Sequence, residues 1–418
     1  MDEFIKKVTG KKDSKYTKSA YTQARTKISP SLFIELNRQI VEEYYKDRSK
    51  VKLFRGMRVL AVDGSTLQLP NIEPILPKKG DDKEKSITLE MSNHLRTIYG
   101  YSSNDKANYE TKARISILED VENNIVHHGI FNSYYSSEKD MAFEHIDYLI
   151  ELRETSSQQE YKDLIIFDRG YPSFALILYL EKNRIDYIIR MPRSRFKEID
   201  KFRDDKRFKD KIIEIELTKN RLYDIKRKNN NPKITNTLKD KKIGDKIKLR
   251  AIKVILDNGE IEILITSLLD KKEYKTKIFK EFYFKRWGIE EEFKAIKSLL
   301  QVENFTGITQ IAINQDFFAT ILLLNMNNAI INDSESEVED YNRAKKRKYQ
   351  YKINRNYAIG TFKEEFIDLI IHSGDIEEFF AYVKDRIVGN LIPYKPDRTF
   401  SRKNSCRHKY PINQKSAI

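Results

Sequence analysis

Cysteine is almost absent from this 418-residue sequence, in which Cys406 is the single example. One cysteine excludes an internal disulfide bond and a metal site built from several thiolates. Long apolar runs are missing too: the most apolar one, at 317–324, is far shorter than the roughly 20 residues of a membrane-spanning helix. The opening Met1-Asp2-Glu3 does not resemble a signal peptide. We therefore expect a soluble protein of the reducing cytoplasm, with no membrane partner.

Acidic residues are fewer than basic ones, 63 against 78, which gives a formal charge of +15 at pH 7. An excess of this size favours a polyanionic partner, nucleic acid before membrane, without choosing DNA over RNA. The basic residues cluster at the start of the chain, at 343–355 and at 395–415. A solvated segment explains each cluster alone, but three clusters on one basic chain favour nucleic acid.

Two apolar segments each end in an aspartate. Residues 57–62 precede Asp63, which is followed by Gly64-Ser65, and residues 164–167 precede Asp168. Both patterns predict a buried strand with an acid at its C-terminal tip. Taken singly, each aspartate is explained as a turn or cap residue.

The remaining periodicities predict helices and a hairpin around these strands. We expect helices from Ser29-Pro30, over 138–154, 172–180 and 276–300, and within 311–326, with a hairpin turning at Asn123-Asn124. Residues 70–110 carry little pattern, which predicts loops. The acidic run 333–340 predicts an exposed break between helices, and the tail after Pro393 is predicted to be poorly ordered. The order strand, hairpin, helix, strand, helix and distant helix predicts an α/β (α+β) fold, a ribonuclease-H-like mixed sheet flanked by helices.

The same patterns divide the chain into five parts. We expect an N-terminal helical region at 1–52, to which the resemblance described below adds DNA binding, and a core in two pieces, 53–186 and 273–332, that holds the candidate site. Between them, 187–272 alternates short strands with lysine-rich loops and includes a hairpin with an Asn-Gly turn, which predicts a β-rich insertion. Residues 333–418 form a basic C-terminal region.

The segment 283–297 predicts a helix with one polar and one apolar face. At about 100° per residue, one arc of roughly 60° collects Tyr283, Arg286, Glu290 and Lys297. The adjacent arc is apolar, so the helix can bury one side and present the other to a cleft. Glu291 and Glu292 point away from Arg286 and Lys297, which makes Glu290 the catalytic candidate among three consecutive glutamates.

Ion pairs such as Arg286 with Glu290 would explain this helix alone. Together with the two strand-end acids, however, Glu290 completes a set of three carboxylates, Asp63, Asp168 and Glu290. Hard oxygen ligands suit Mg²⁺ or Mn²⁺, and three carboxylates can hold two ions about 4 Å apart for phosphodiester chemistry. Arg286 and Lys297 would then bind phosphates and Tyr283 would donate a hydrogen bond to one.

Two further features have simpler explanations. Trp287, the only tryptophan, is a candidate to stack on a displaced base, although packing beside a core helix is the commoner role. His127-His128 falls in a predicted strand, where adjacent side chains point to opposite faces, so a joint metal site is not expected.

These residues resemble the insertion-sequence transposases of the IS-four type within the DDE superfamily. That family's signature is Tyr, two residues, Arg, three residues, Glu, six residues, Lys, and the spacing is met by Tyr283, Arg286, Glu290 and Lys297. Residues 62–65 and 167–171, which include Arg169, resemble its two aspartate motifs. The match spans about 57–300, and the segment 187–270 corresponds to the family's β-rich insertion.

The resemblance implies a DNA transposase with two Mg²⁺ or Mn²⁺ ions at the three acids and DNA contacts from Arg169 and Trp287 besides the signature residues. The implied reaction nicks the element ends, forms and opens a hairpin, and transfers the strands. The implied partners are double-stranded terminal repeats and target DNA, and a second copy of the chain in the synaptic complex. The implied location is the nucleoid of a bacterium or archaeon. The flanking regions would recognise element ends and support dimer formation, and the insertion would contact DNA.

Two other interpretations share some of these residues. A structure-specific endonuclease of the same fold would use the acids without joining strands. A domesticated, non-catalytic DNA-binding protein would use the basic clusters and tolerate Asp63→Asn.

Overall fold

The computed structural model describes residues 17–70, 94–103, 109–228, 232–239, 241–256, 259–372 and 375–395. The first basic cluster, much of the expected 70–110 loop and most of the C-terminal tail therefore lie outside the described residues. Nine strands of the described chain form one mixed sheet. Eight of them follow the order β2-β3-β1-β5-β6-β9-β8-β7, and the ninth, β4, also pairs with β3. No helix in these ranges is long and apolar enough to span a membrane.

The centre of the sheet has the expected element order, and the mixed sheet flanked by helices is confirmed. Its elements are β1 (Met57–Gln68), β2 (Tyr101–Ser103), β3 (Tyr109–Asp120), β4 (Ile125–Ser133), α5 (Glu138–Thr155), η1 (Ser157–Glu160), β5 (Lys162–Phe167), α6 (Phe174–Lys182) and β6 (Asp186–Arg190). Strands β1 and β3 are antiparallel, as are β3 and β4, whereas β5 runs parallel to β1 and β6 parallel to β5. The β3–β4 turn contains Asn124 at a φ of 51°, as an Asn-Asn turn allows.

The segment after β6 extends the same sheet. It contains α7 (Lys197–Asp204), β7 (Asp210–Glu216), α8 (Lys219–Lys228), α9 (Pro232–Thr237), β8 (Lys246–Ile255) and β9 (Ile261–Thr266). Strands β7, β8 and β9 confirm the predicted strands, but the helices were not predicted. Lysine-rich stretches such as α8 read as loops because their apolar side chains are few; Ile225 is buried against the core that α6 helps to build.

The remaining elements of the described chain are helices and a small two-stranded sheet. They include α10 (Ile278–Lys285), α11 (Trp287–Lys294), the π-helical turn η2 (Ala295–Leu299), α12 (Gln310–Asp333), α13 (Glu335–Ala344), β10 (Tyr351–Ile353), α14 (Arg355–His372), α15 (Ile376–Val388) and β11 (Leu391–Pro393). At the N-terminal end are α2 (Lys18–Arg25) and α3 (Pro30–Tyr44), which begins at Pro30 as predicted, with Ser29 accepting a hydrogen bond from the Ser31 amide. The acidic stretch 333–340 is not a break but mostly helix α13, separated from α12 by Ser334 alone.

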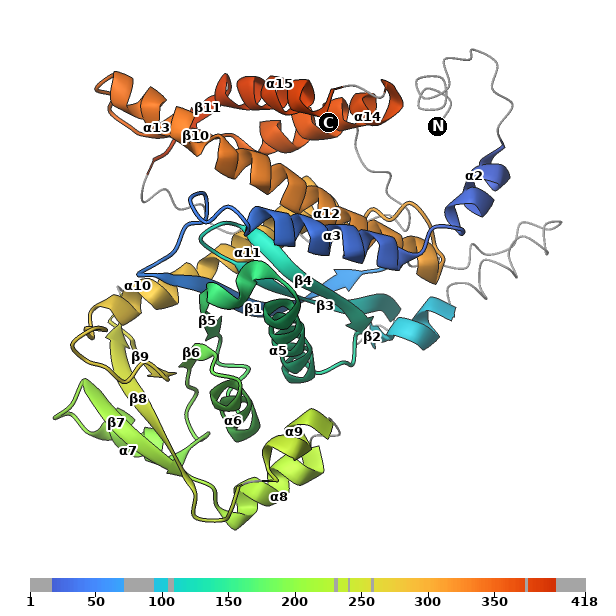
Figure 1. Ribbon diagram of the computed structural model, residues 1–418. Coiled ribbons are helices and arrows are strands. Elements are labelled where there is room, and N and C mark those ends of the chain that lie inside the picture. The colour runs from blue at the N-terminus through green and yellow to red at the C-terminus, as the bar shows by residue number, and fades with distance from the viewer. Residues whose placement is uncertain are drawn as a thin grey trace.

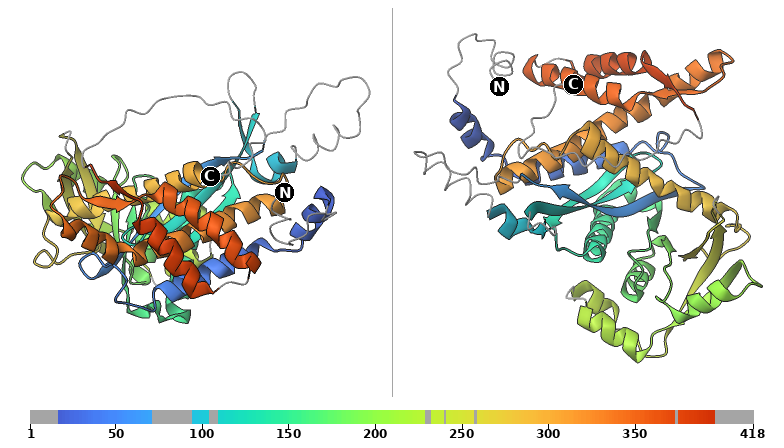
Figure 2. Two further views of the ribbon diagram at one scale, coloured as in Figure 1. Left: turned by 90° about the horizontal axis from the view of Figure 1, so that it is seen from above. Right: turned by 180° about the vertical axis from the view of Figure 1, so that it is seen from behind.

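Helices cover both faces of the central strands (Figure 1). One core joins strand residues such as Val62 and Phe167 to α5 and α6. On the opposite face, Ala61 and Ile117 pack with α11 and α12 in a second core. Helix α3 lies alongside α12, and the C-terminal helices pack on the far side of α12 from the sheet, as Figure 2 also shows.

A buried ion pair joins β1 to β5 at matching positions. Arg58 and Asp163 are register partners, and the Arg58 guanidinium donates two hydrogen bonds to the Asp163 carboxylate, at 2.6 and 3.1 Å. Both side chains are fully buried, and Arg153 supplies a second guanidinium 2.9 Å from Asp163. The Arg58 guanidinium also lies 4.8 Å from the centre of the Tyr45 ring and 5.1 Å from that of Tyr161, two cation–π contacts that add to the ion pair.

We expect Arg58→Met to lower the free energy of unfolding by about 3–5 kcal/mol, because it leaves Asp163 buried with Arg153 alone. Urea unfolding measures the change. Arg48→Met is the matched control, since it removes an exposed ion pair with Glu160 and should cost less than about 1 kcal/mol. Equal losses in the two variants would contradict a role for the buried pair in joining the strands.

Candidate active site

The parallel pairing of β1 and β5 sets the positions of the two candidate aspartates. Val62 is the register partner of Phe167, and the next position on each chain is Asp63 or Asp168. Neighbouring strands lie about 4.8 Å apart, so the two aspartates are adjacent and face away from the core that holds Val62 and Phe167. They point to the side of the sheet that α10 and α11 cover.

Asp63 does not end its strand, which corrects the sequence expectation. Strand β1 continues to Gln68 because β3 pairs with it throughout, and Gly64 and Ser65, read as a turn, face Ser116 and Ile115. Asp168 does follow the last residue of β5, as expected. The two acids therefore share one level of the sheet although one strand ends there and the other continues.

The predicted single helix over 276–300 is also corrected. It divides at Arg286 into α10 and α11 and finishes in the π-helical turn η2. The polar face nevertheless stays together. The Tyr283 hydroxyl donates a hydrogen bond to Asp168 Oδ1 at 3.1 Å, and Lys297 Nζ donates to Ser65 Oγ at 2.7 Å and to the Thr66 carbonyl at 2.8 Å.

Arg286 lies among the three candidate acids. Its guanidinium donates to Glu290 Oε1 at 2.8 Å and lies 3.9 Å from Asp63 Oδ2, and its charge also acts on Asp168. The side chain is buried, and its Nε finds no hydrogen-bond partner in the described chain. This one cation therefore holds Glu290 and faces the other two acids.

The two aspartates have opposite electrostatic surroundings. Burial raises the pKa of Asp63 to about 6, and the carboxylates of Asp168 and Glu138 act in the same direction against the Gly64 amide and Arg286. Burial also acts to raise the pKa of Asp168, but the Arg169 amide and nearby positive charges outweigh it and leave that pKa below its usual value. Burial raises the pKa of Tyr283 to about 12, so its hydroxyl stays a donor near neutral pH.

The other glutamates of the signature segment point elsewhere. Glu291 is exposed near Lys294, whereas Glu292 is fully buried. Glu292 accepts hydrogen bonds from Asn328 of α12 at 2.7 Å and from Arg355 of α14 at 2.8 Å. The prediction that only Glu290 shares the face of Arg286 is confirmed by these contacts, and Glu292 anchors α11 to the C-terminal helices.

Two candidate DNA-binding residues are accessible. The Trp287 side chain is 48% exposed, and the Arg286 guanidinium lies 5.1 Å from the centre of its ring. Arg169 is exposed next to Asp168. The two histidines of β4 have separate partners, as expected: His127 contacts the Tyr45 hydroxyl and His128 contacts His145.

Asp63, Asp168 and Glu290 supply the hard oxygen donors that divalent metal ions prefer, and burial already penalises the negative charge of Asp63. Within the described ranges, however, no three His, Cys, Asp or Glu side chains lie close enough together to hold an ion. Glu290 instead accepts a hydrogen bond from Arg286, whose guanidinium also lies 3.9 Å from Asp63.

Residues 54–326 match the family model described as transposase DDE domain. The chain belongs to this family. No curated protein matches the sequence. Among solved structures, this chain is similar to a chain in the cryo-EM structure of the piggyBac transposase synaptic complex with hairpin DNA, at 10% identity and a TM-score of 0.37. The alignment covers 81% of this chain and 59% of that one.

Sequence reasoning missed other residues at the aspartates of this DDE domain. Arg190, at the end of β6, lies 3.4 Å from Asp168 Oδ1 and also binds Glu262. Glu138, the first residue of α5, acts on Asp63 from the other side. The signature spacing says nothing about either residue. Arg190 and Glu138 could be placed near the aspartates only once the order of the strands in the sheet was known.

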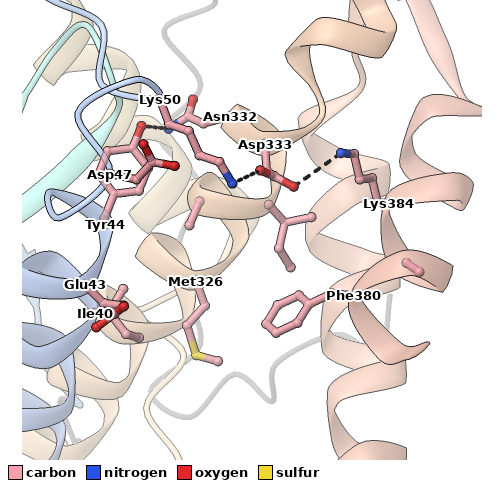
Figure 3. Close-up of a pocket in the computed structure, with 13 residues that line it drawn as sticks. Ile40, Glu43, Tyr44, Asp47, Lys50, Met326, Asn332, Asp333, Phe380 and Lys384 are labelled. Atoms are coloured by element: carbon pink, nitrogen blue, oxygen red, sulfur yellow. Dashed lines mark hydrogen bonds and ion pairs between the residues drawn. The ribbon is translucent and has the colours of Figure 1, made fainter. Parts of the chain in front are cut away.

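A large cavity of the DDE transposase chain lies away from these residues. It measures about 650 Å³ and is formed by α3, α12 and α15 (Figure 3). Asp333 accepts hydrogen bonds there from Lys50 at 2.7 Å and from Lys384 at 3.2 Å. None of the candidate catalytic residues lines it, so cavity size does not locate the chemistry in this fold.

We expect Asp63→Asn to stabilise the metal-free domain by about 3 kcal/mol at pH 8, because a pKa of about 6 against the usual 3.8 means that folding opposes ionisation. The penalty builds up as the pH rises from about 4 to about 6 and is complete above that, so the gain should fall away towards pH 4. Asp168→Asn should destabilise at pH 8, since the pKa of Asp168 is lowered and its charge is stabilised by folding. Urea unfolding in the presence of a chelator tests both signs, and a loss of stability in Asp63→Asn at pH 8 would refute the assignment.

Proposed function

We propose that this protein is a DNA transposase of the IS-four type that performs cut-and-paste transposition of an insertion sequence. The observation that carries the proposal is that Arg286 interacts with all three acids, Asp63, Asp168 and Glu290. Tyr283 and Lys297 of the signature spacing face the same end of β1 and β5. Membership of the transposase DDE domain family supports this assignment.

In this proposal Asp63, Asp168 and Glu290 hold two Mg²⁺ or Mn²⁺ ions. The ions would supply activation of the attacking oxygen and stabilisation of the leaving oxygen at a phosphodiester. Arg286 meanwhile has a second role, because its single positive charge offsets part of the negative charge of the three acids and its hydrogen bond holds Glu290. Glu290 has to exchange this guanidinium for a metal ion, which would free Arg286 for a phosphate group of DNA.

The other candidate residues would position DNA. Lys297 contacts Ser65 and Thr66 at the end of β1, where it would bind a phosphate next to the acids. Tyr283 would orient Asp168 and donate to a phosphate. The exposed ring of Trp287 is placed to stack on a displaced base, and Arg169 would bind backbone beside Asp168.

We assign the reaction steps by the resemblance in sequence: nicking at the element ends, hairpin formation by the freed 3′ hydroxyl, hairpin opening, and transfer to target DNA. The partners are then double-stranded terminal inverted repeats and target DNA, with a homodimer in the synaptic complex at the nucleoid. Regions 1–52 and 333–418 would bind element ends and the second copy. The segment 187–272 would contact DNA beside the core formed by 53–186 and 273–332.

The decisive variant is Glu290→Gln, for which we expect strand cleavage in Mg²⁺ or Mn²⁺ to fall by about 10³-fold or more. The substrate is labelled DNA that carries the inverted repeats flanking the gene. Glu291→Gln is the matched control, because it removes the same charge one position along the helix at an exposed site, and it should retain activity within about twofold. Asp168→Ala should behave like Glu290→Gln.

The products distinguish the candidate functions. Joined strands that depend on metal and on Asp168 support a transposase. Metal-dependent cleavage without joining supports an endonuclease of the same fold. Binding without cleavage, unchanged by Asp63→Asn, supports a domesticated DNA-binding protein and overturns the proposal.

A further inference from the structure

Glu138 approaches Asp63 from the face of the sheet opposite to Glu290. It is the first residue of α5, which packs against β1 and β3. Its side chain lies directly on Gly64: a Cβ atom added to Gly64 would be 2.9 Å from Glu138 Cγ and 3.1 Å from Oε1. A glycine is therefore needed after Asp63 for this carboxylate to reach the strand.

One cation holds Glu138 in this position. The Arg114 guanidinium, from β3, donates a hydrogen bond to Glu138 Oε1 and another to the Tyr134 carbonyl. About a third of the Glu138 side chain remains exposed, at 36%. The start of α5 also favours a negative charge, since the amides of a helix N-terminus are not paired within the helix. Glu138 thus resembles Glu290 in being an acid near the aspartates that is held by a single arginine.

A buried hydroxyl nearby has no partner. Tyr171 is 1% exposed, and its OH group makes no hydrogen bond to any described residue. The negative charges that act on it most strongly are those of Asp63, Glu138 and Asp168, in that order. An unpaired buried hydroxyl costs about 1–3 kcal/mol, so its retention among three carboxylates calls for a function.

We propose that Glu138 and Tyr171 belong to the divalent-cation site, Glu138 as a fourth carboxylate beside Asp63 and Tyr171 as the hydroxyl that fixes these carboxylates when an ion is bound. The proposal rests on the function proposed above and adds two residues outside the signature. It explains three observations together: the close approach at Gly64, the arginine on Glu138 and the unpartnered hydroxyl of Tyr171.

The simpler interpretation is that Glu138 only ties the start of α5 to Arg114. In that case its loss would weaken the fold and leave the affinity for metal unchanged. The two interpretations therefore differ in a binding constant that can be measured without DNA and without turnover.

The experiment is calorimetric titration of the full chain with Mn²⁺ at pH 7.5. We expect Glu138→Gln to weaken Mn²⁺ binding by roughly 10- to 100-fold. Asp140→Asn is the matched control, because it removes an exposed acid from the same first helical turn, and it should bind like the wild type. Asp168→Asn serves as the reference for a damaged central site.

Tyr171→Phe gives an independent measurement if Glu138→Gln folds poorly. Removal of an unpaired buried hydroxyl should leave the stability of the metal-free chain equal or higher, whereas Mn²⁺ binding should weaken by a factor of about ten. A purely structural tyrosine would change the first quantity and not the second. Urea unfolding in a chelator accompanies each titration.

The outcomes separate the two proposals. If Asp168→Asn abolishes Mn²⁺ binding while Glu138→Gln and Tyr171→Phe bind within twofold of the wild type, the fourth-carboxylate proposal is overturned and the transposase proposal stands. If the wild-type chain takes up no Mn²⁺, the metal site itself is wrong and both proposals fail. Weakened binding in both variants, with Asp140→Asn unchanged, supports the inference.

Discussion

The register between β1 and β5 is the constraint on which the rest of the structure depends. The fully buried pair Arg58–Asp163 fixes it, because a slip of one position would separate the guanidinium from its carboxylate in the interior. Five residues further along each strand the same register brings Asp63 beside Asp168. It also assigns alternate residues to opposite cores, one under α5 and α6 and one under α11 and α12. An ion pair remote from the chemistry thus determines which side chains meet at the candidate site.

The candidate site concentrates electrostatic cost that the fold must offset. Asp63 is held where burial opposes its charge, and Arg286 is buried with one nitrogen unpaired. Neither arrangement favours stability: a cation would relieve the first, and an anionic acceptor would relieve the second. This is the pattern expected of a site arranged for a charged ligand rather than for the folded state alone.

The sequence predicted those parts of the structure that depend on local pattern. The strands before Asp63 and Asp168, the hairpin, α5 and the polar face with Glu290 follow from alternation and helical spacing, and these were found. Asp63 was misplaced at a strand tip because Gly64-Ser65 is typical of a turn, whereas pairing with β3 overrides that local preference. The π-helical turn and the approach of Glu138 depend on packing between segments far apart in the chain, which spacing alone does not reveal. Catalytic roles remain predictions.

The contact between Glu292 and Arg355 joins the signature helix α11 to helix α14, which is synthesised much later. Glu292 belongs to α11, two residues after Glu290, and its side chain is fully buried. The cation that pairs with it comes from α14, more than sixty positions later. Glu119, also fully buried, adds a second acid near Arg355. A nascent chain that has not yet released α14 from the ribosome therefore carries an uncompensated charge under its signature helix. Arg355 thus supports the signature helix, and a copy of the gene truncated before α14 would encode a chain in which Glu292 loses this cation and keeps only the hydrogen bond from Asn328.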